Sequence, residues 1–285
     1  AGAVVPPDEY WPRLLEVCNH YGVLLIADEV QTGMGRTGEI FGVDHWQVAP
    51  DILCLGKALG GGVVPMSAFF STAKIWECME PNPFMHTTTT GGNPLACSAA
   101  LAAITVLLEE DLAGQAKTKG AYMLSQLRQL QERYPGVLAD VRGLGLLIGM
   151  EFITDGIGYK VASGLFSRGV LAAGTLTNAK TIRIEPALNI PREILDEVLN
   201  RLEDVLRDVL ETIARQDRRQ LRLHTAAQRK AKQKAKQATK ASQDGDLPIG
   251  DPQADTGQSS TSLGREITAG PGESTSLLQE FQSGV

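Results

Sequence analysis

The segments VLLIADEVQTG (residues 23–33) and DILCLGKALGGG (residues 51–62) each contain a short apolar run followed by a charged residue. The runs, Val23–Ala27 and Ile52–Leu55, predict buried strands of a parallel sheet. Asp28 follows the first run and Lys57 follows the second. Ligands of open α/β sheets bind at the carboxyl ends of the strands, so a carboxylate and an amine at that edge indicate a site.

These two residue types suit one cofactor. A lysine in a partly desolvated pocket loses its charge more easily and forms a Schiff base with an aldehyde. Pyridoxal phosphate supplies an aldehyde and needs a carboxylate beside its ring nitrogen. Lys57 and Asp28 could fill these roles, but a structural ion pair at the sheet edge explains the two residues alone equally well.

Four motifs extend the pattern along the chain: ADEVQTGMGRTG, LGKALGGGVVPMSA, HTTTTGGNPLACSAA and GTLTNAKTIRIEPAL. Together they resemble the class III pyridoxal-phosphate aminotransferases of fold type I, over about Gly2 to Leu210. Within that family the chain is most similar to putrescine aminotransferases, followed by the ornithine and acetylornithine enzymes. The resemblance implies an α/β fold, with part of a large, mostly parallel-sheet domain followed by a small α+β domain.

The resemblance divides the chain into three parts. Residues 1–112 would be the C-terminal part of the cofactor-binding large domain, and residues 113–213 the small C-terminal domain. Residues 214–285 form a basic, then Ser/Gly-rich tail that we expect to be disordered, with a polar helix as the alternative for its basic part. The upstream family segment that carries a phosphate loop and a stacking aromatic is not in these residues. We therefore expect a fragment of a longer enzyme, and an inactive binding or scaffold unit is the alternative.

The resemblance also implies roles for single residues. Lys57 would hold pyridoxal phosphate and act as general base, Asp28 would keep the ring nitrogen protonated, and Gln31 would contact the phenolic oxygen. Thr89 would bind the cofactor phosphate of the partner subunit, which implies a homodimer. Arg183 would hold the carboxylate of the oxo-acid through its guanidinium fork.

Each of these residues also has an ordinary explanation. Gln31 could face solvent in a loop, Thr89 could cap a helix, and Arg183 could be a paired surface residue. The chain also departs from the family at two positions. It has Thr90 where the family usually has Phe or Tyr, and Ala187 where the family often has Pro.

A rival hypothesis comes from Gly33–Gly38, which matches G-x-G-x-x-G directly after a predicted strand. This is the fingerprint of nicotinamide-dependent oxidoreductases, whose glycines open a helix that meets the pyrophosphate. Here EIFGVDHWQVAPD follows, interrupted by Gly42 and Pro50 and without a helical stripe. We therefore expect an irregular loop beside the cofactor.

The composition limits the classes of partner. The net charge of −6 argues against nucleic-acid binding, and no apolar run has the length of a membrane span. The histidines show no metal-ligand spacing. The cysteines form no Cys-x-x-Cys motif and suit free thiols in a reducing, cytoplasmic compartment. These cysteines are Cys18, Cys54, Cys78 and Cys97.

The periodicity of apolar residues and the start and stop signals of helices predict the other elements. The expected helices are Pro6–Tyr21, Thr72–Met79, Leu95–Leu108, Ala116–Tyr134, Ile157–Arg168 and Pro191–Ile213. The expected strands are Val63–Phe70, a hairpin over residues 137–153, Val170–Ala173 and Thr181–Glu185, and a hinge is expected over Glu109–Gly114.

The predicted activity is transamination from a small-molecule amine, such as the diamine putrescine, to an oxo-acid such as 2-oxoglutarate. This would place the protein in polyamine catabolism. An ornithine or acetylornithine aminotransferase is the alternative. An aminomutase or a decarboxylase stays open within the same cofactor class, because Asp28 and Lys57 alone do not define the reaction.

Overall fold

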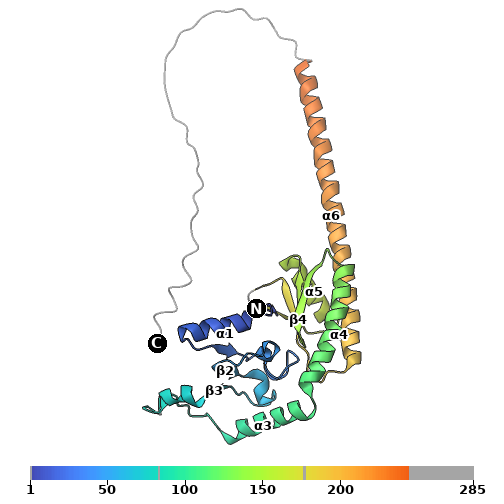
Figure 1. Ribbon diagram of the computed structural model, residues 1–285. Helices are drawn as coiled ribbons and strands as arrows, with labels where there is room; N and C mark the ends of the chain where they lie inside the picture. The colour runs from blue at the N-terminus through green and yellow to red at the C-terminus, as the bar shows by residue number, and fades with distance from the viewer. Residues whose placement is uncertain (1, 83, 176–177, 244–285) are drawn as a thin grey trace, which may run out of the picture. The chain divides into compact units, whose positions relative to one another are not determined.

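The computed structural model describes residues 2–82, 84–175 and 178–243 (Figure 1). The chain divides into two compact units, Ala1–Ala226 and Ala227–Val285. No helix within the described residues is both long and apolar enough to cross a membrane. The four cysteines are free, and the described residues contain no cluster of His, Cys, Asp and Glu that could hold a metal ion.

The first sheet has the strand order β1-β2-β3. Its strands are β1 (Ile26–Asp28), β2 (Ile52–Leu55) and β3 (Ala68–Ser71). β1 and β2 are parallel, with Asp28 opposite Cys54, whereas β3 is antiparallel to β2. The parallel pair and the bounds of β2 are as the sequence predicts. Because parallel strands end at the same edge, Asp28 and Lys57 leave the sheet on one side.

Three strands begin later than predicted, and one of them is the two-residue strand at Ala173–Gly174, which was expected to start at Val170. β1 begins only at Ile26, because the backbone N–H of Leu25 donates to the Asp51 carboxylate at 2.8 Å and so does not join the ladder. β3 begins only at Ala68, because the N–H groups of Val63 and Val64 donate to Gly60 O in a turn. Pro65 follows this turn and has no N–H to give to a strand.

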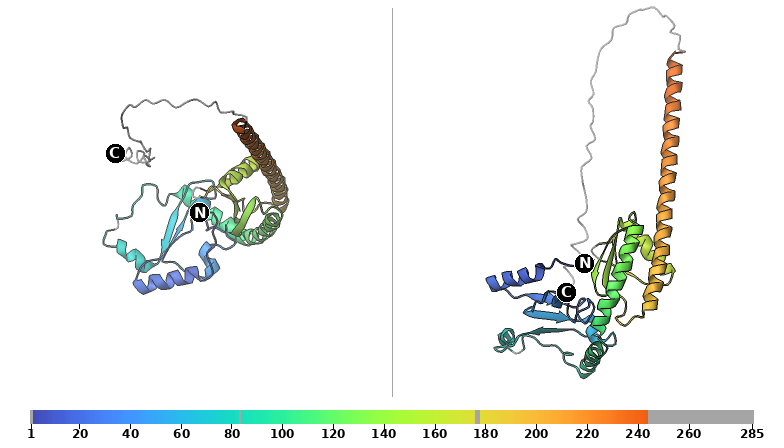
Figure 2. Two further views of the ribbon diagram at one scale, coloured as in Figure 1. Left: turned by 90° about the horizontal axis from the view of Figure 1, so that it is seen from above. Right: turned by 45° about the vertical axis from the view of Figure 1, so that its right-hand side comes forward.

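Helices lie on both sides of the first sheet. They are α1 (Tyr10–Tyr21), η1 (Gly42–Trp46), η2 (Lys57–Gly60), α2 (Ala73–Trp76), η3 (Glu77–Met79) and α3 (Pro94–Glu109). Figures 1 and 2 show α1 and α3 on opposite sides of the strands. α1 ends at Gly22, whose left-handed backbone (φ 63°) closes the helix. α3 begins at Asn93, whose side chain accepts the N–H of Ala96 at 2.9 Å.

The second sheet is antiparallel, with the order β4-β5-β7-β6. Its strands are β4 (Leu138–Leu144), β5 (Leu147–Phe152), β6 (Ala173–Gly174) and β7 (Thr181–Ile184). The predicted hairpin is confirmed as β4 and β5. Its turn contains Gly145 (φ 52°), where a Cβ atom would lie 2.3 Å from the backbone carbon of Thr37. Only glycine allows this contact between the hairpin and the loop after β1.

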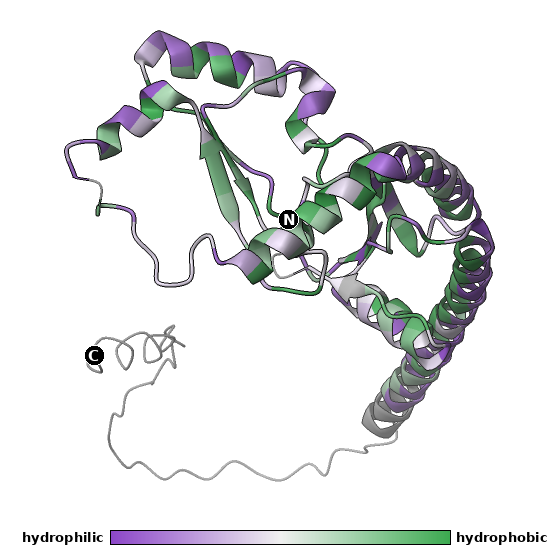
Figure 3. Ribbon diagram, turned by 90° about the horizontal axis from the view of Figure 1, so that it is seen from below, coloured by the Kyte–Doolittle hydropathy of each residue, from purple (hydrophilic) through white to green (hydrophobic). Residues whose placement is uncertain are grey.

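Three helices cover the second sheet: α4 (Leu112–Arg133), α5 (Asp155–Ser167) and α6 (Arg192–Gln243). Their apolar faces and the strands form the larger core, which includes Leu127, Phe152 and Leu206, each at most 1% exposed. Figure 3 shows the green, hydrophobic stretches of these helices alternating with purple, hydrophilic ones. This pattern is typical of helices with one buried face.

α1 begins at Tyr10 instead of Pro6 and α5 at Asp155 instead of Ile157, and two further helix boundaries also differ from the prediction. α4 starts at Leu112, because Asp111 caps it by accepting the N–H of Gly114 at 3.1 Å, so the expected hinge shrinks to Glu110 and Asp111. α6 continues beyond Ile213 to Gln243 and is exposed from Arg215 to the last residue whose burial is described. The basic part of the tail is therefore helical. The disorder expected for residues 244–285 lies outside the described residues.

Candidate functional site

The carboxyl edge of β1 and β2 delivers two of the predicted residues. Asp28 ends β1 with an exposed side chain, and its carboxylate accepts the N–H of Val30 at 3.1 Å. β2 ends at Leu55, and Lys57 opens η2 two residues later with an exposed side chain.

Lys57 has an unusual backbone. Its φ of 44° lies in the left-handed region, which a residue with a Cβ rarely occupies. Such a conformation costs on the order of 1–3 kcal/mol and is found preferentially at functional sites. This observation favours a functional lysine over a lysine that merely pairs with a carboxylate.

A hydrogen-bond network joins Lys57 to the second sheet. The Lys57 Nζ donates to Gln31 Oε1, and Gln31 Nε2 donates to Glu185 Oε1 at 3.2 Å. The Arg183 guanidinium forms an ion pair with the same oxygen of Glu185 at 3.2 Å. The structure thus brings together three predicted site residues from distant segments, and it adds Glu185. We call these four residues the Lys57 network.

Glu185 was not among the predicted site residues, although the sequence contains a signal for it. Side chains two residues apart on a strand point to the same side, so a functional Arg183 on β7 directs attention to the residue two positions later. Residue 185 directly follows the last residue of β7.

Arg183 retains an unused donor. Its Nε is buried and has no hydrogen-bond partner among the described residues. A buried donor without a partner is unfavourable by about 1–3 kcal/mol, so a ligand that accepts this hydrogen bond is favoured. Nε–H beside a terminal nitrogen is the donor pair with which a guanidinium binds a carboxylate through two parallel bonds.

Arg36 holds the loop after β1 next to the Lys57 network through hydrogen bonds. Its guanidinium donates to Leu146 O at 3.2 Å and to Pro186 O at 2.6 Å. Burial lowers the pKa of Arg36, and the nearby Glu185 carboxylate opposes this shift. The guanidinium stays charged at neutral pH, because arginine loses its proton only at strongly basic pH. Arg36 therefore adds positive charge on the side of Glu185.

This loop is not a dinucleotide fingerprint. After the glycines of residues 33–38, the chain enters the short 3-10 helix η1 instead of a crossover α-helix. The expectation of an irregular loop is confirmed. Without a helix N-terminus behind the glycines, the pyrophosphate of a dinucleotide would have no anion site here.

A second glutamate stabilises the loop from inside. Glu29 is 3% exposed, and its carboxylate accepts the N–H of Gly42 and of Val43, each at 2.8 Å, and the hydroxyl of Thr32. All three donors lie within the loop between β1 and β2. Glu29 therefore has a structural role in ordering the start of η1.

Asp28 and Thr89 lie outside the Lys57 network. Neither has a hydrogen bond or ion pair with Lys57, Gln31 or Arg183 among the described residues. Thr89 is exposed in the loop before α3, and so is Thr90, the departure from the family pattern. Their roles stay predictions.

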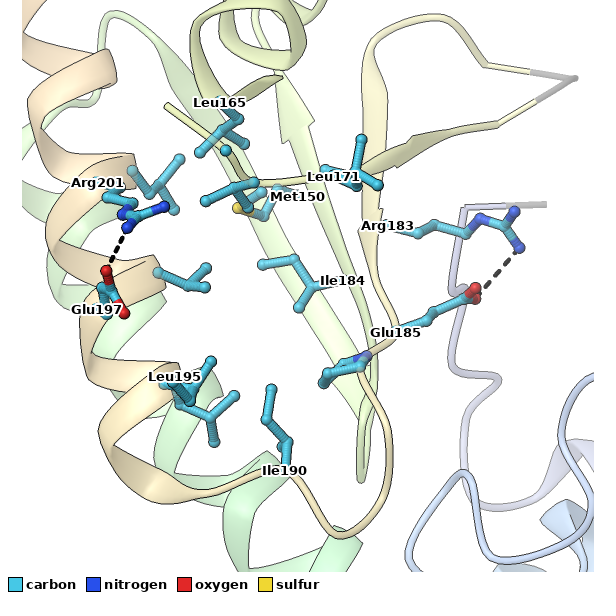
Figure 4. Close-up of a pocket in the computed structure, with 17 residues that line it drawn as sticks. Met150, Leu165, Leu171, Arg183, Ile184, Glu185, Ile190, Leu195, Glu197 and Arg201 are labelled. Atoms are coloured by element: carbon cyan, nitrogen blue, oxygen red, sulfur yellow. Dashed lines mark hydrogen bonds and ion pairs between the residues drawn. The ribbon is translucent and has the colours of Figure 1, made fainter. Parts of the chain in front are cut away.

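A cavity of about 450 Å³ lies on the other side of β7 (Figure 4). Apolar residues such as Met150, Ile184 and Leu195 line it beneath α6. In Figure 4, Arg183 and Glu185 extend away from these apolar side chains. Arg183 and Glu185 are themselves among the residues that line the cavity, so the cavity borders the Lys57 network at β7.

Comparisons with known proteins agree with this geometry. The profile of the family described as aminotransferase class-III matches residues 1–206. The structure is similar to that of an ornithine aminotransferase from Toxoplasma gondii ME49, with 38% identity and a TM-score of 0.69 over 74% of this chain and 49% of that chain. Another structure of the Toxoplasma gondii enzyme has partial occupancy of pyridoxal phosphate at its active site.

Two further structures extend the likeness. An acetylornithine aminotransferase from Elizabethkingia anophelis is 36% identical, with a TM-score of 0.68 over 73% of this chain and 52% of that chain. An amine transaminase from an uncultivated Pseudomonas species is 38% identical, with a TM-score of 0.68 over 73% of this chain and 50% of that chain. The chain spans about half the length of these relatives. By its family match and its fold, it belongs to the class III aminotransferases, a family of pyridoxal-phosphate-dependent enzymes of fold type I.

Proposed function

We propose that the protein transfers an amino group from a primary amine to an oxo-acid, with pyridoxal phosphate as cofactor. The Lys57 network carries this proposal, because it connects a lysine in a strained conformation to an arginine with an unpartnered donor. An amine site and a carboxylate site side by side are what the two halves of a transamination require.

The residues present fit the cofactor. Lys57 offers a primary amine for the aldehyde, and Gln31, in direct contact with Lys57 Nζ, offers an amide for the phenolic oxygen. Asp28 leaves the same sheet edge and would hold the ring nitrogen in its protonated form. Pyridoxal phosphate, when bound, supplies an electron sink for the negative charge that develops on the substrate carbon.

Lys57 and Arg183 have distinct tasks in this proposal. Lys57 Nζ binds the cofactor and, once freed by the incoming amine, removes a proton from the substrate carbon that carries nitrogen. Arg183 binds the carboxylate of the oxo-acid, for which 2-oxoglutarate is our candidate. The unpartnered Nε of Arg183 supports this assignment.

For the amine donor we propose a diamine such as putrescine, and hence a place in polyamine catabolism. The motifs of the sequence favour this donor, and the Pseudomonas relative is an amine transaminase. Ornithine or acetylornithine is the second candidate, favoured by the names of two other relatives. An inactive fragment is the alternative for the chain alone, since the chain spans about half of its relatives.

We also propose a homodimer in which Thr89 reaches the cofactor phosphate of the partner subunit. The exposure of the loop that carries Thr89 supports such a contact. The four free cysteines suit a cytoplasmic compartment. The two separate sheets support a division between a large domain, residues 1–112, and a small domain, residues 113–213.

The experiment that tests the proposal is borohydride reduction of the protein with pyridoxal phosphate, followed by peptide mass mapping. We expect a phosphopyridoxyl group on Lys57 and on no other lysine. A group spread over several surface lysines, or found only on another lysine, would refute the role of Lys57.

A further inference from the structure

Glu185 uses only one of its two carboxylate oxygens. Gln31 Nε2 and the Arg183 guanidinium both contact Oε1, each at 3.2 Å. Oε2 has no hydrogen bond or ion pair among the described residues. A carboxylate has about four acceptor positions, so Glu185 can still bind a donor at Oε2.

The existing contacts of Glu185 are also weak. Hydrogen bonds between charged nitrogen and carboxylate oxygen normally measure about 2.7–2.9 Å, and the Glu185–Arg183 contact is longer, at 3.2 Å. The Glu185 side chain is 20% exposed, so a ligand can reach it. The nearby Arg36 already directs hydrogen bonds to the carbonyls of Leu146 and Pro186.

We propose that Glu185 binds the second ammonium group of a diamine donor through Oε2 and so sets the preference for diamines over monoamines. This inference rests on the proposed function, because it names the donor class of the same site. The ammonium supplies the donors that Oε2 lacks.

The spacing of the network fits a four-carbon diamine. One amide group, that of Gln31, separates Lys57 Nζ from Glu185. Two hydrogen bonds and one amide give a separation of roughly 6–8 Å. An extended chain of five bonds, as between the nitrogens of putrescine, spans roughly 6 Å. A diamine with one nitrogen at the Lys57 position can therefore bring its other nitrogen within hydrogen-bonding reach of Glu185.

Ornithine differs from a diamine because it carries a carboxylate, which the same residues would have to accommodate. Its carboxylate would lie near Glu185 and repel it, unless Arg183 moved to pair with the ligand. A donor without a carboxylate leaves the Arg183–Glu185 pair in place. The arrangement seen here, with Glu185 between Gln31 and Arg183, thus favours diamines over amino acids.

The test compares putrescine with butylamine, which has the same carbon chain but no second ammonium, in the holoenzyme and its Glu185→Gln variant. We expect Glu185→Gln to raise the KM for putrescine roughly 10- to 100-fold more than the KM for butylamine, as for the loss of one charged hydrogen bond. Glu197→Gln is the matched control, because Glu197 also pairs with an arginine but lies on α6. We expect it to change neither value.

A second variant keeps the proposal testable should Glu185→Gln fold poorly. Glu185→Asp retains the charge but shortens the side chain by one carbon. If Oε2 binds the distal ammonium, the preferred donor shifts from putrescine to the five-carbon diamine cadaverine. An unchanged preference in Glu185→Asp would overturn the proposal.

Two other results would overturn it as well. One is an equal loss with putrescine and butylamine in Glu185→Gln, and the other is a wild-type enzyme that does not prefer putrescine. In both cases the proposed function stands if borohydride still labels Lys57 and both amines are converted. Loss of the label in the wild type would instead refute the proposed function.

Discussion

Glu29 and Glu185 both accept hydrogen bonds from the loop after β1 and differ in what holds them. Glu29 is buried, and two backbone N–H groups at 2.8 Å and a threonine hydroxyl surround its carboxylate. Glu185 is partly exposed, and its contacts come from the side chains of Gln31 and Arg183, both on one oxygen at 3.2 Å. The first carboxylate has a full set of fixed donors, and the second has an open oxygen.

This difference separates a structural carboxylate from one that is free to bind a ligand. Backbone donors cannot move away without unfolding η1, so Glu29 has one arrangement. The side chains around Glu185 can rotate, and Lys57, Gln31 and Arg183 are the residues that the family resemblance connects with cofactor and substrate. Variants in the two regions should therefore affect different quantities, namely stability for Glu29 and turnover for the Lys57 network.

The largest effect is expected for Lys57→Ala, which removes both the amine for the cofactor and the proposed general base. We expect kcat to fall by at least roughly 10³-fold. The covalent cofactor label should vanish, while the melting temperature stays at the wild-type value. Lys74→Ala, at an exposed lysine of α2, is the control. Substantial turnover in Lys57→Ala would remove Lys57 from the mechanism.

Glu29→Ala should have the largest effect on stability. It leaves the buried N–H groups of Gly42 and Val43 without acceptors, and we expect the free energy of unfolding to fall by about 3 kcal/mol. Urea denaturation measures this loss in the free energy of unfolding. The control is Glu39→Ala in the same loop, whose exposed ion pair with Lys117 should contribute less than about 1 kcal/mol. Equal losses in the two variants would contradict the distinction between the two glutamates.

Arg183→Ala should weaken the use of 2-oxoglutarate more than the use of the amine. We expect kcat/KM for the oxo-acid to fall roughly 100-fold, because a charge-assisted pair of hydrogen bonds is lost. Half-reaction kinetics with each substrate separate the two effects. Arg168→Ala removes a comparable arginine, which pairs with Asp208 and has no hydrogen bond or ion pair with the network among the described residues, and should change the kinetics with neither substrate. An equal fall for both substrates in Arg183→Ala would count against a carboxylate site.

The smallest effect is expected for Thr154→Ala, which lies in neither region. The Thr154 hydroxyl caps α5 by accepting the N–H of Ile157 at 3.3 Å. Loss of such a cap lowers the free energy of unfolding by about 1 kcal/mol. We expect this loss in urea denaturation and no change in kcat/KM. A loss of turnover here would mean that the small domain influences the Lys57 network more widely than its contacts indicate.

Much of the site could be predicted from single motifs. The bounds of β2 followed from its apolar run, and the positions of Lys57, Gln31 and Arg183 followed from motifs in a known order. A motif carries the residue types that a reaction needs, and the fold brings them together. The prediction of an irregular loop at Gly33–Gly38 also held, because only the short 3-10 helix η1 follows it.

The remaining features depend on contacts that a sequence pattern does not contain. Asp28 and Glu29 are adjacent carboxylates, and only the position of η1 decides that Glu29 is the buried one. The predicted start of β3 at Val63 was wrong, because the N–H groups of Val63 and Val64 donate to Gly60 O in a turn. The importance of Glu185 depends on the position of Gln31, which is 154 residues away in the sequence.

The left-handed backbone of Lys57 also indicates how the chain would respond to directed evolution. Glycine adopts this conformation freely, so Lys57→Gly would relieve a strain of roughly 1–2 kcal/mol. A library screened only for heat resistance would thus enrich variants that have replaced Lys57. The most heat-resistant clones would then have no transaminase activity. A screen that alternates heat challenge with a growth requirement for the product would retain it.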